Sequence, residues 1–249
     1  MTISFIVTSY NYDKYISETI DSIKKQKYQD IEIIVVDDAS TDNSIKILEN
    51  TKDITLIKHK KNHGQLAAII TGLKKAKGEY ISIIDSDDTL NPEYAGILLS
   101  AIKENEVALV TSNCKDTRLL TPAEYPFGGW YWAPMSCGMF KREVLNCILN
   151  YKNTDLWKIC PDKLLFNLAH IQGNSLILKN NLVNKRNHAK NAGKTPLRFL
   201  VNVKNNFIIR HEALNIIDSQ VLKIMIKKSY PHLLKQIFQF GVRKLKNKK

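Results

Sequence analysis

The sequence predicts an α/β fold in which a mostly parallel β-sheet is flanked by helices. Two observations support this prediction. Between residues 3 and 111, short runs rich in Ile and Val alternate with segments of helical periodicity, and these runs carry few charges. Near-continuous apolar strands joined by helices are typical of a parallel sheet that is covered on both faces. Such doubly wound sheets bind ligands at the carboxyl ends of their strands.

Five strands are expected in the first half of the chain: Ile3–Thr8, Glu32–Asp37, Ile54–Lys58, Tyr80–Asp85 and Val107–Thr111. The segments between them have apolar residues at helical spacing. These residues are Tyr15, Ile16, Ile20 and Ile23, then Ile45 and Leu48, then Leu66, Ile69, Ile70 and Leu73, then Tyr94, Ile97, Leu98 and Ile102. Each of these segments has a helix start signal, for example Ser40 or Asp42 before Ile45 and the pair Asn91-Pro92 before Tyr94.

The pattern weakens after residue 112. Residues 121–134 are rich in Pro, Gly and aromatic residues and are interpreted as an ordered loop. We then expect a strand at Met135–Phe140, helices at Lys141–Leu149 and Asp162–Ile171, and a strand at Ser175–Leu178. From Thr195 onward, two or three basic helices are expected, with a break at Pro231.

Charge divides the 249 residues into two parts. The formal net charge is +13, and residues 197–249 hold twelve of the 37 basic residues but only two of the 24 acidic ones. We therefore predict a domain at residues 1–196 and a basic amphipathic helical tail at residues 197–249. Cationic amphipathic helices bind anionic membrane surfaces. The alternative is a helical extension that packs on the domain through Leu200, Phe207 and Phe238.

Cysteine spacing and the absence of targeting signals predict a cytoplasmic protein. The four cysteines, Cys114, Cys137, Cys147 and Cys160, include no close pair of the kind that a zinc knuckle or a redox motif needs, so reduced thiols are expected. The sequence shows no signal-peptide pattern and no apolar run near the roughly 20 residues that cross a bilayer. The tail would then attach the protein peripherally to the inner face of the cell membrane.

Acidic residues follow two of the predicted strands. Asp37 and Asp38 end one strand, and Asp85 and Asp87 follow another. Four carboxylates at one sheet edge would repel one another unless a cation lay there, and their oxygens suit Mg²⁺ or Mn²⁺. Such a metal takes further ligands from phosphates, so a nucleotide diphosphate is the expected partner. Two further acids of these segments, Asp42 and Asp88, are interpreted as helix caps.

Three blocks of sequence carry a resemblance to a known family. They are SFIVTSYNYDKYISETIDSIKKQ, IEIIVVDDASTDNS and KNHGQLAAIITGLKKAKGEYISIIDSDD, which together cover roughly residues 3 to 90. In this order and spacing, the chain resembles the family 2 glycosyltransferases of bacterial surface-polysaccharide type. The resemblance implies the GT-A fold, a Rossmann-like fold of nucleotide-diphospho-sugar transferases, and an inverting reaction.

The resemblance implies roles for matching positions. The expected nucleotide-binding residues are Thr8, Ser9 and Tyr10 at the uridine, Asp38 at the uracil ring, Asn62, Gly64 and Gln65 in an Asn-x-Gly segment, and Asp85 and Ser86 in the DxD motif. The expected metal ligands are Asp87 and His188. Alternatives remain for three of them: Tyr10 as a core aromatic, Gly64 as a turn residue and His188 as a surface residue. The sequence departs from the family at residues 68–70, where Ala-Ile-Ile replaces Ala-Arg-Asn and an arginine near the nucleotide is missing.

Asp162 is the expected catalytic base of the inverting reaction. The family's base is an acid that opens a helix in the second half, and Asp162 matches it, although Pro161 replaces the usual preceding acid. The alternative is an N-terminal helix residue that favours the helix dipole. Asp155 and Glu143 are second choices. The roles of two further groups are left open. Lys185 and Arg186 either contact phosphate or are solvated. The aromatic residues either stack on an acceptor sugar or pack in the core; they are Phe127, Trp130, Tyr131 and Trp132.

The function that this resemblance implies is metal-dependent transfer of a hexosyl or N-acetylhexosaminyl group from a UDP-sugar to a hydroxyl of a glycan or lipid-linked acceptor, in lipopolysaccharide, capsule or exopolysaccharide biosynthesis. Residues 1–111 would bind the nucleotide sugar and residues 112–196 the acceptor. No Gln-x-x-Arg-Trp element of processive synthases is present, so one sugar is expected per encounter. A catalytically impaired relative is the alternative. Nucleic-acid binding through the tail is disfavoured because RNP, KH and zinc-finger motifs are absent.

Overall fold

The computed structural model describes residues 1–119, 131–158 and 161–186. The chain divides into two compact units, one of Met1–Thr117 with Ala133–His188 and the other of Arg118–Trp132 with Ala189–Lys249. Several predictions lie outside the described residues. They concern His188, Phe127, Trp130, Cys160 and the basic tail with Leu200, Phe207 and Phe238.

The first unit is built on a sheet of seven strands, which confirms the predicted α/β class. Its strands are β1 (Ile3–Ser9), β2 (Ile31–Asp37), β3 (Thr55–Lys58), β4 (Tyr80–Asp85), β6 (Leu109–Asn113), β9 (Gly138–Lys141) and β10 (Ser175–Asn181). They lie in the order β10-β6-β9-β4-β1-β2-β3. Every pair is parallel except the two that β9 makes, because β9 runs antiparallel between β4 and β6.

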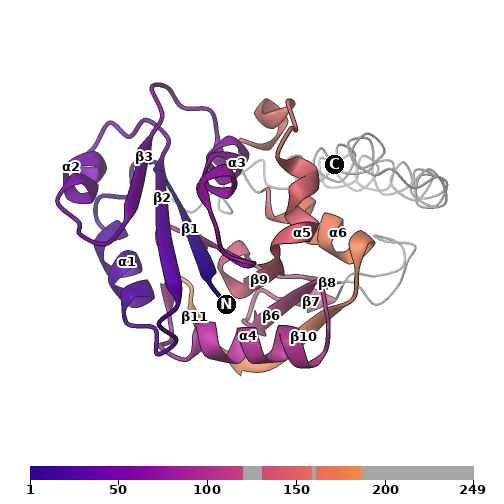
Figure 1. Ribbon diagram of the computed structural model, residues 1–249. Helices are drawn as coiled ribbons and strands as arrows, with labels where there is room; N and C mark the ends of the chain where they lie inside the picture. Colours follow the sequence, from indigo (N-terminus) through magenta and orange to yellow (C-terminus); the bar gives the residue numbers. More distant parts are fainter. Residues whose placement is uncertain (120–130, 159–160, 187–249) are drawn as a thin grey trace, which may run out of the picture. The chain divides into compact units, whose positions relative to one another are not determined.

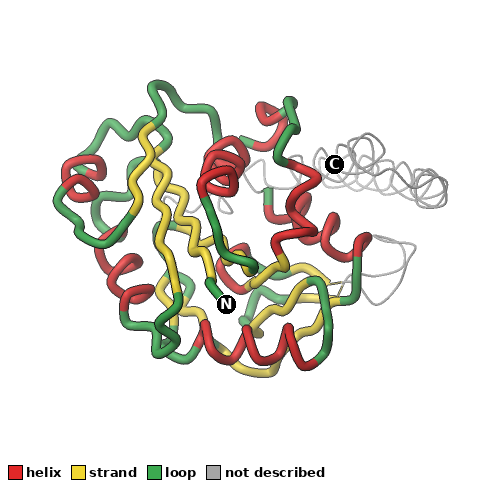
Figure 2. Tube along the Cα trace, viewed as in Figure 1, coloured by secondary structure: helices red, strands yellow, loops and turns green. Residues whose placement is uncertain are grey.

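Helices cover both faces of this sheet. They are α1 (Ile16–Lys24), α2 (Ser44–Glu49), α3 (Gln65–Lys75), α4 (Tyr94–Glu104), α5 (Arg142–Leu145) and α6 (Asp162–Gln172). Figure 1 shows α1 and α2 on one side of β1, β2 and β3 and α3 on the other, and Figure 2 shows the alternation of strand and helix along this half. The predicted apolar stripe of α1 is buried at Ile16, Ile20 and Ile23. Helical periodicity therefore identified the core-facing side correctly.

Three parts of the second half differ from the prediction. The strand expected from Met135 begins only at Gly138, because a 3₁₀ turn, η1 (Met135–Cys137), comes first. Pro134 opens this turn, and its carbonyl accepts the backbone N–H of Cys137 at 3.0 Å. The helix expected over 141–149 splits into α5 and a second 3₁₀ turn, η2 (Asn146–Ile148), and a third, η3 (Thr154–Trp157), follows.

Two pairs of very short strands complete the fold. In the first unit, β5 (Thr89–Leu90) pairs antiparallel with β11 (Val183–Asn184). In the second unit, β7 (Arg118–Leu119) pairs with β8 (Tyr131–Trp132), and β8 lies within the stretch 121–134 that was predicted to be a loop. Two residues are too short to produce a periodic pattern, and pairing with a distant segment creates these strands.

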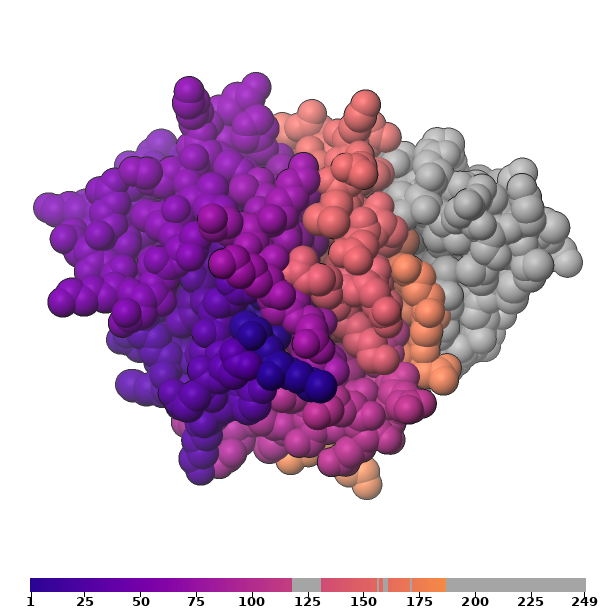
Figure 3. All heavy atoms as spheres, in the orientation of Figure 1, coloured from indigo at the N-terminus to yellow at the C-terminus, as the bar shows by residue number. Residues whose placement is uncertain are grey.

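The central strands form the core. All seven residues of β1 are buried, and so are the last five of β2. In Figure 3, the indigo-to-magenta residues of the N-terminal half and the salmon residues of the second half lie directly against each other on the viewed face. In the part of the chain that the structure describes, no helix is long and apolar enough to cross a membrane.

Candidate functional site

The candidate site lies at the carboxyl edge of three adjacent strands. The register pairs Ser9 with Asp37 and Thr8 with Asp85, so β1 lies between the acidic ends of β2 and β4. Neighbouring strands are about 4.8 Å apart, which separates the two acidic ends by roughly 10 Å. The predicted acids therefore do share one edge, in two groups.

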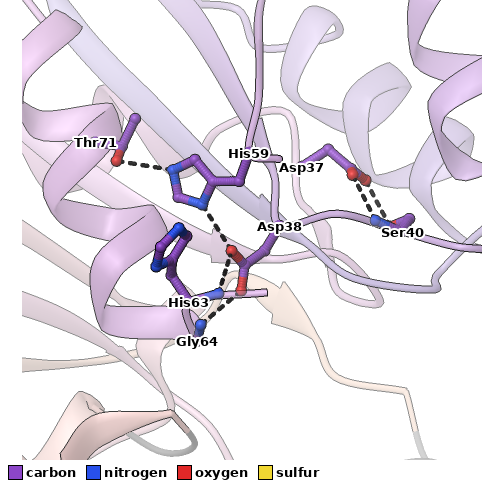
Figure 4. A network of polar contacts seen from close by, with 7 residues as sticks. All are labelled: Asp37, Asp38, Ser40, His59, His63, Gly64 and Thr71. Carbon is purple, nitrogen blue, oxygen red and sulfur yellow. Dashed lines mark hydrogen bonds and ion pairs between the residues drawn. The ribbon is translucent and has the colours of Figure 1, made fainter. Parts of the chain in front are cut away.

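The acids of β2 are held by donors of the protein itself, as Figure 4 shows. Asp37 accepts hydrogen bonds from the backbone N–H and the hydroxyl of Ser40, at 2.8 and 2.6 Å. Asp38 accepts the backbone N–H groups of His63 and Gly64, at 2.9 and 2.7 Å, and lies 2.7 Å from Nδ1 of His59. These contacts relieve the repulsion that the sequence led us to expect here, and they fix the loop of residues 59–64 to the end of β2.

His59 extends this network to α3. Its Nε2 lies 3.0 Å from the Thr71 hydroxyl, and its ring meets the ring of His63 edge to face, with centroids 5.3 Å apart. Asp38 is only 3% exposed. A carboxylate buried so deeply needs its hydrogen bonds, so His59 is a structural partner that the family pattern did not predict.

The sequence left open whether Gly64 is only a turn residue, and the structure shows that a glycine is needed at this position. Its φ angle is +89°, which favours glycine, and a Cβ atom there would lie 2.6 Å from the Cα of Lys158. The next residue, Gln65, donates its backbone N–H to the Lys158 carbonyl at 3.1 Å. The backbone of the second half thus lies directly on the start of α3.

The acids after β4 form the second group, and their charges interact. Burial raises the pKa of Asp85 well above its usual range, and the neighbouring charges of Asp88 and Asp87 raise it further. The side-chain amide of Gln65 donates to Oδ1 of Asp85 at 2.7 Å, while the backbone N–H of Asp85 donates to the Ser136 hydroxyl at 3.0 Å. Negative charge is therefore concentrated at the end of β4 and only partly compensated.

Asp88 does not cap a helix, which corrects our expectation. β5 intervenes before α4, whose N-cap residue is Glu93 and has no side-chain cap, while the Asn91 side chain accepts the backbone N–H of Glu93 at 2.9 Å in the preceding turn. Both carboxylate oxygens of Asp88 are buried without a well-formed hydrogen bond among the described residues. Burial raises the pKa of Asp88 to about 6, although the nearby Ser136 hydroxyl lowers it. Asp42 accepts the backbone N–H of Ser44, the first residue of α2, at 2.9 Å, although the N-cap position itself is held by Asn43.

The residues expected at the uridine lie around the end of β1. Thr8 is 9% exposed, whereas Tyr10 is 43% exposed and is therefore not the core aromatic of the alternative interpretation. Ser9 is buried, and its hydroxyl has no hydrogen-bond partner among the described residues. The Ser86 hydroxyl donates to the Thr8 carbonyl, so it holds the DxD turn against β1.

The loops after β1 and β2 are joined by a second set of bonds that the sequence did not reveal. Asn11 and Ala39 both adopt positive φ angles, 61° and 66°. The Asn11 side-chain oxygen accepts the backbone N–H of Thr41 at 2.7 Å, and the backbone N–H of Asn11 donates to the Ser40 hydroxyl at 2.9 Å. Asn tolerates this left-handed conformation better than most residues, and this was the available sequence signal.

Tyr12 is a site residue that the sequence reasoning missed. Burial raises its pKa, and the negative charges of Asp87 and Asp85 raise it further, so the phenol lies close to the DxD acids. A single buried tyrosine in a loop produces no recognisable sequence pattern. The position becomes evident only when the loop after β1 folds over the end of β4.

Two cations reach this region from the end of the described chain. Lys185 lies 3.2 Å from Asp116, and although burial lowers its pKa, Asp116 and the charges of Asp88 and Asp85 hold that pKa above its usual value. Arg186 is paired with Glu18 and lies 5.4 Å from the centroid of the Tyr15 ring. The pairing of β11 with β5 brings both residues here. Neither is simply solvated.

The three candidate bases lie in different places. Asp162 is the first residue of α6, and its charge contributes to the raised pKa of Asp85. It therefore lies near Asp85, Asp87 and Asp88, which together form the acidic cluster. The side chain of Asp155 is 85% exposed and lies 3.5 Å from the Lys158 ammonium. Glu143 acts on the pKa of Tyr80, which begins β4, and therefore lies at the opposite end of the strand from Asp85.

The acids after β4 have the chemistry that a hard divalent cation needs. Among the described residues, no three His, Cys, Asp or Glu side chains are already arranged as a metal cage. A cation bound by one or two carboxylates and completed by phosphate oxygens does not require such a cage. The buried, poorly satisfied oxygens of Asp88 and the raised pKa of Asp85 are what uncompensated negative charge produces, so the residues present fit a cation.

The remaining site predictions have simpler outcomes. Asn62 is exposed at the tip of the loop before α3. Ile69, at the position of the family's arginine, is fully buried in the α3 core, so this departure substitutes a packing residue for a charged one. Tyr131 and Trp132 form β8 in the second unit.

Comparison with known proteins identifies a family and related folds. The model of the family "Glycosyl transferase family 2" matches residues 4–149. An uncharacterized glycosyltransferase of Nostoc is 29% identical over 77% of this chain and 66% of its own length. Glycosyltransferase GlyG of Streptococcus pneumoniae is 41% identical over 45% of this chain and 38% of its own. The chain thus spans less than two thirds of the length of these curated relatives.

Two solved structures share the fold. S. aureus TarS 1–349 in complex with UDP-GlcNAc superposes with a TM-score of 0.68 at 22% identity, over 96% of this chain and 73% of that one. The mannosyltransferase PcManGT of Pyrobaculum calidifontis, in complex with GDP-Man and Mn²⁺, gives 0.63 at 18% identity, over 96% and 75%. The GT-A fold that the sequence predicted is thereby confirmed.

Proposed function

The chain belongs to glycosyltransferase family 2, and from that premise we propose that it is an enzyme that transfers a sugar from a UDP-sugar to a hydroxyl group. The single observation that carries the proposal is the concentration of buried, mutually repelling carboxylates after β4, beside a loop network fixed by Asp38. A diphosphate with its cation is the ligand that this charge pattern favours.

The donor is proposed to bind across the ends of β1, β2 and β4. Ser9 supports this because a buried hydroxyl without a partner among the described residues is suited to a ligand. The exposed ring of Tyr10 supports it too, since an aromatic face can stack on a base. UDP is preferred over other nucleotides because the structure of TarS, a relative in fold, was solved with UDP-GlcNAc.

Asp87 and the diphosphate would hold Mg²⁺ or Mn²⁺, with His188 as the further ligand that the family pattern suggests, and Asp85 would contact the nucleotide. When bound, such a cation stabilises the charge that develops on the departing nucleoside diphosphate. Lys185 would add positive charge on the same side, because its ammonium already acts on Asp85 and Asp88.

Asp162 is proposed to take the proton of the acceptor hydroxyl. The oxygen of that hydroxyl forms a bond to the anomeric carbon while the bond from that carbon to the diphosphate breaks, with inversion of configuration. Asp162 is the first residue of α6, and the N-terminal end of a helix favours negative charge at this position. A glycan or a lipid-linked glycan of the cell surface is the proposed acceptor.

We place the reaction in the cytoplasm, at the inner membrane face, because of the charge of residues 197–249. Co-sedimentation of the full chain with anionic vesicles, but not with neutral ones, is the expected result. Equal, weak binding to both would remove this part of the proposal and leave the enzymatic part intact.

The test of the enzymatic proposal is a panel of UDP-sugars titrated into the full chain with and without Mn²⁺. We expect metal-dependent binding of at least one of them, which Asp87→Asn abolishes. Asp21→Asn on the exposed face of α1 is the matched control and should bind normally. Metal-independent binding in both variants would contradict the role of Asp87. Binding without any turnover of the donor would favour the catalytically impaired alternative.

A further inference from the structure

The fold brings two cysteines together that the sequence separates by 23 residues. Cys114 directly follows β6, and Cys137 directly precedes β9. These strands are antiparallel neighbours with Thr111 opposite Gly138, so the two cysteines lie just beyond this pair. Both are free thiols, and each is a cause of the shift in the other's pKa, so the two side chains lie close together.

The two thiols have opposite environments. Cys114 is half-buried, its backbone N–H donates to the Thr117 hydroxyl at 3.2 Å, and its Sγ lies 3.5 Å from that oxygen. The hydrogen bond from Cys137 is the main cause that lowers the pKa of Cys114 to about 6, and burial opposes it only in part. For Cys137, the same hydrogen bond and burial raise the pKa well above its usual value.

This asymmetry defines two chemical roles. A thiolate is the nucleophile in thiol oxidation, so the partly accessible Cys114 is suited to attack an oxidant. Cys137 is 0% exposed and keeps its proton, so it is shielded from direct attack but lies next to the reacting sulfur. An accessible thiolate beside a second cysteine is the usual arrangement of peroxide-sensitive sites.

We propose that Cys114 and Cys137 are a reversible oxidation site, in which Cys114 reacts with hydrogen peroxide and Cys137 resolves the product as a disulfide. The Cys114 thiolate takes one oxygen from the peroxide and becomes a sulfenic acid, with hydroxide released and then protonated to water. The Cys137 thiol then displaces the sulfenic hydroxyl as water. In total, two thiols and one peroxide give one disulfide and two water molecules, and a dithiol reductant reverses the change.

The position of the pair links it to the acidic cluster. Ser136, the neighbour of Cys137 in η1, accepts the backbone N–H of Asp85 at 3.0 Å. The charge of Asp88 also contributes to the raised pKa of Cys137. A disulfide that moves η1 would therefore disturb the end of β4. This consequence rests on the proposed function, whereas the oxidation itself does not.

The test uses the intact, reduced full chain and hydrogen peroxide, followed by alkylation and peptide mass mapping. The four cysteines lie in four different tryptic peptides, so each is measured separately. We expect the peptides of Cys114 and Cys137 to become linked with the loss of two hydrogens. Cys147, whose pKa burial raises, is the internal control and should remain reduced.

Two variants assign the roles. In Cys137→Ser, a sulfenic acid trapped by dimedone should accumulate on Cys114. In Cys114→Ser, Cys137 should stay reduced under the same conditions. Oxidation of Cys147 at the same rate as Cys114 in the unmodified protein, or failure of the linked peptide to form there, would overturn the proposal. Because both outcomes are read in the unmodified chain, they do not depend on the folding of a variant, and loss of donor binding is scored separately.

Discussion

The side-chain amide of Gln65 donates a 2.7 Å hydrogen bond to Oδ1 of Asp85 and so joins the first residue of α3 to the last residue of β4. Gln65→Glu would replace this donor by a further negative group beside Asp85, in addition to Asp87, Asp88 and Asp162. We expect binding of UDP with Mn²⁺ to weaken about tenfold, which corresponds to roughly 1.4 kcal/mol. Isothermal titration calorimetry measures the affinity for UDP in both proteins.

The control for this change is Gln29→Glu, which adds the same charge on an exposed residue whose amide bonds only to nearby backbone carbonyls. It should leave UDP affinity unaltered. An equal loss in both variants would mean that net charge, and not the contact with Asp85, determines the effect.

Gly64→Ala should destabilise the fold. The positive φ angle and the close Cα of Lys158 both oppose a side chain, and a strained backbone of this kind costs on the order of 1–3 kcal/mol. Gly96→Ala in α4 is the matched control, because a Cβ atom there meets nothing within 4 Å, and a gain of about 0.5–1 kcal/mol is expected. Urea denaturation compares the two free energies of unfolding.

His59→Ala should cost about 1–3 kcal/mol of stability, because the buried Asp38 carboxylate loses one of its three partners. Thr71→Val removes only the contact on the other side of the ring and should cost less, about 0.5–1.5 kcal/mol. The same denaturation experiment measures both changes. If the two variants lost the same free energy, the Asp38 contact would not be the one that matters.

Asp162→Asn should leave UDP-sugar binding intact and reduce transfer by at least about a hundredfold, the lower range for the loss of a general base. Asp155→Asn, at an exposed carboxylate of the same segment, should transfer normally. Calorimetry gives binding, and release of UDP in the presence of acceptor gives turnover. Near-normal turnover of Asp162→Asn would reassign the base.

Alkylation of Cys114 by iodoacetamide should depend on pH with a midpoint near 6, because the thiolate that reacts forms as pH rises through the lowered pKa. The rate should therefore be nearly constant from pH 7 to 8. In Cys137→Ser, where a serine hydroxyl replaces the thiol donor, the midpoint should shift. A rate that still rises tenfold per pH unit above pH 7 in the unmodified protein would contradict the lowered pKa.

The sequence predicted what depends on local pattern and order along the chain. Strands such as Tyr80–Asp85 were located to the residue because apolar runs between turn signals leave few alternatives. It did not predict that Asp38 binds the loop of residues 59–64, that Asp88 caps no helix, or that Tyr12 approaches Asp87. These facts arise when distant loops meet at one sheet edge, and a linear pattern does not encode such meetings.

The placement of β9 has a consequence for how the chain is made. β4 and β6 are complete before β9 exists, and 24 residues separate Asn113 from Gly138. At about 5–20 residues per second, a ribosome takes roughly 1–5 seconds to make them. Throughout that interval the facing edges of β4 and β6 are unpaired and able to bind a wrong strand. The pairing that covers these two edges therefore forms only after Lys141, the last residue of β9, has been made.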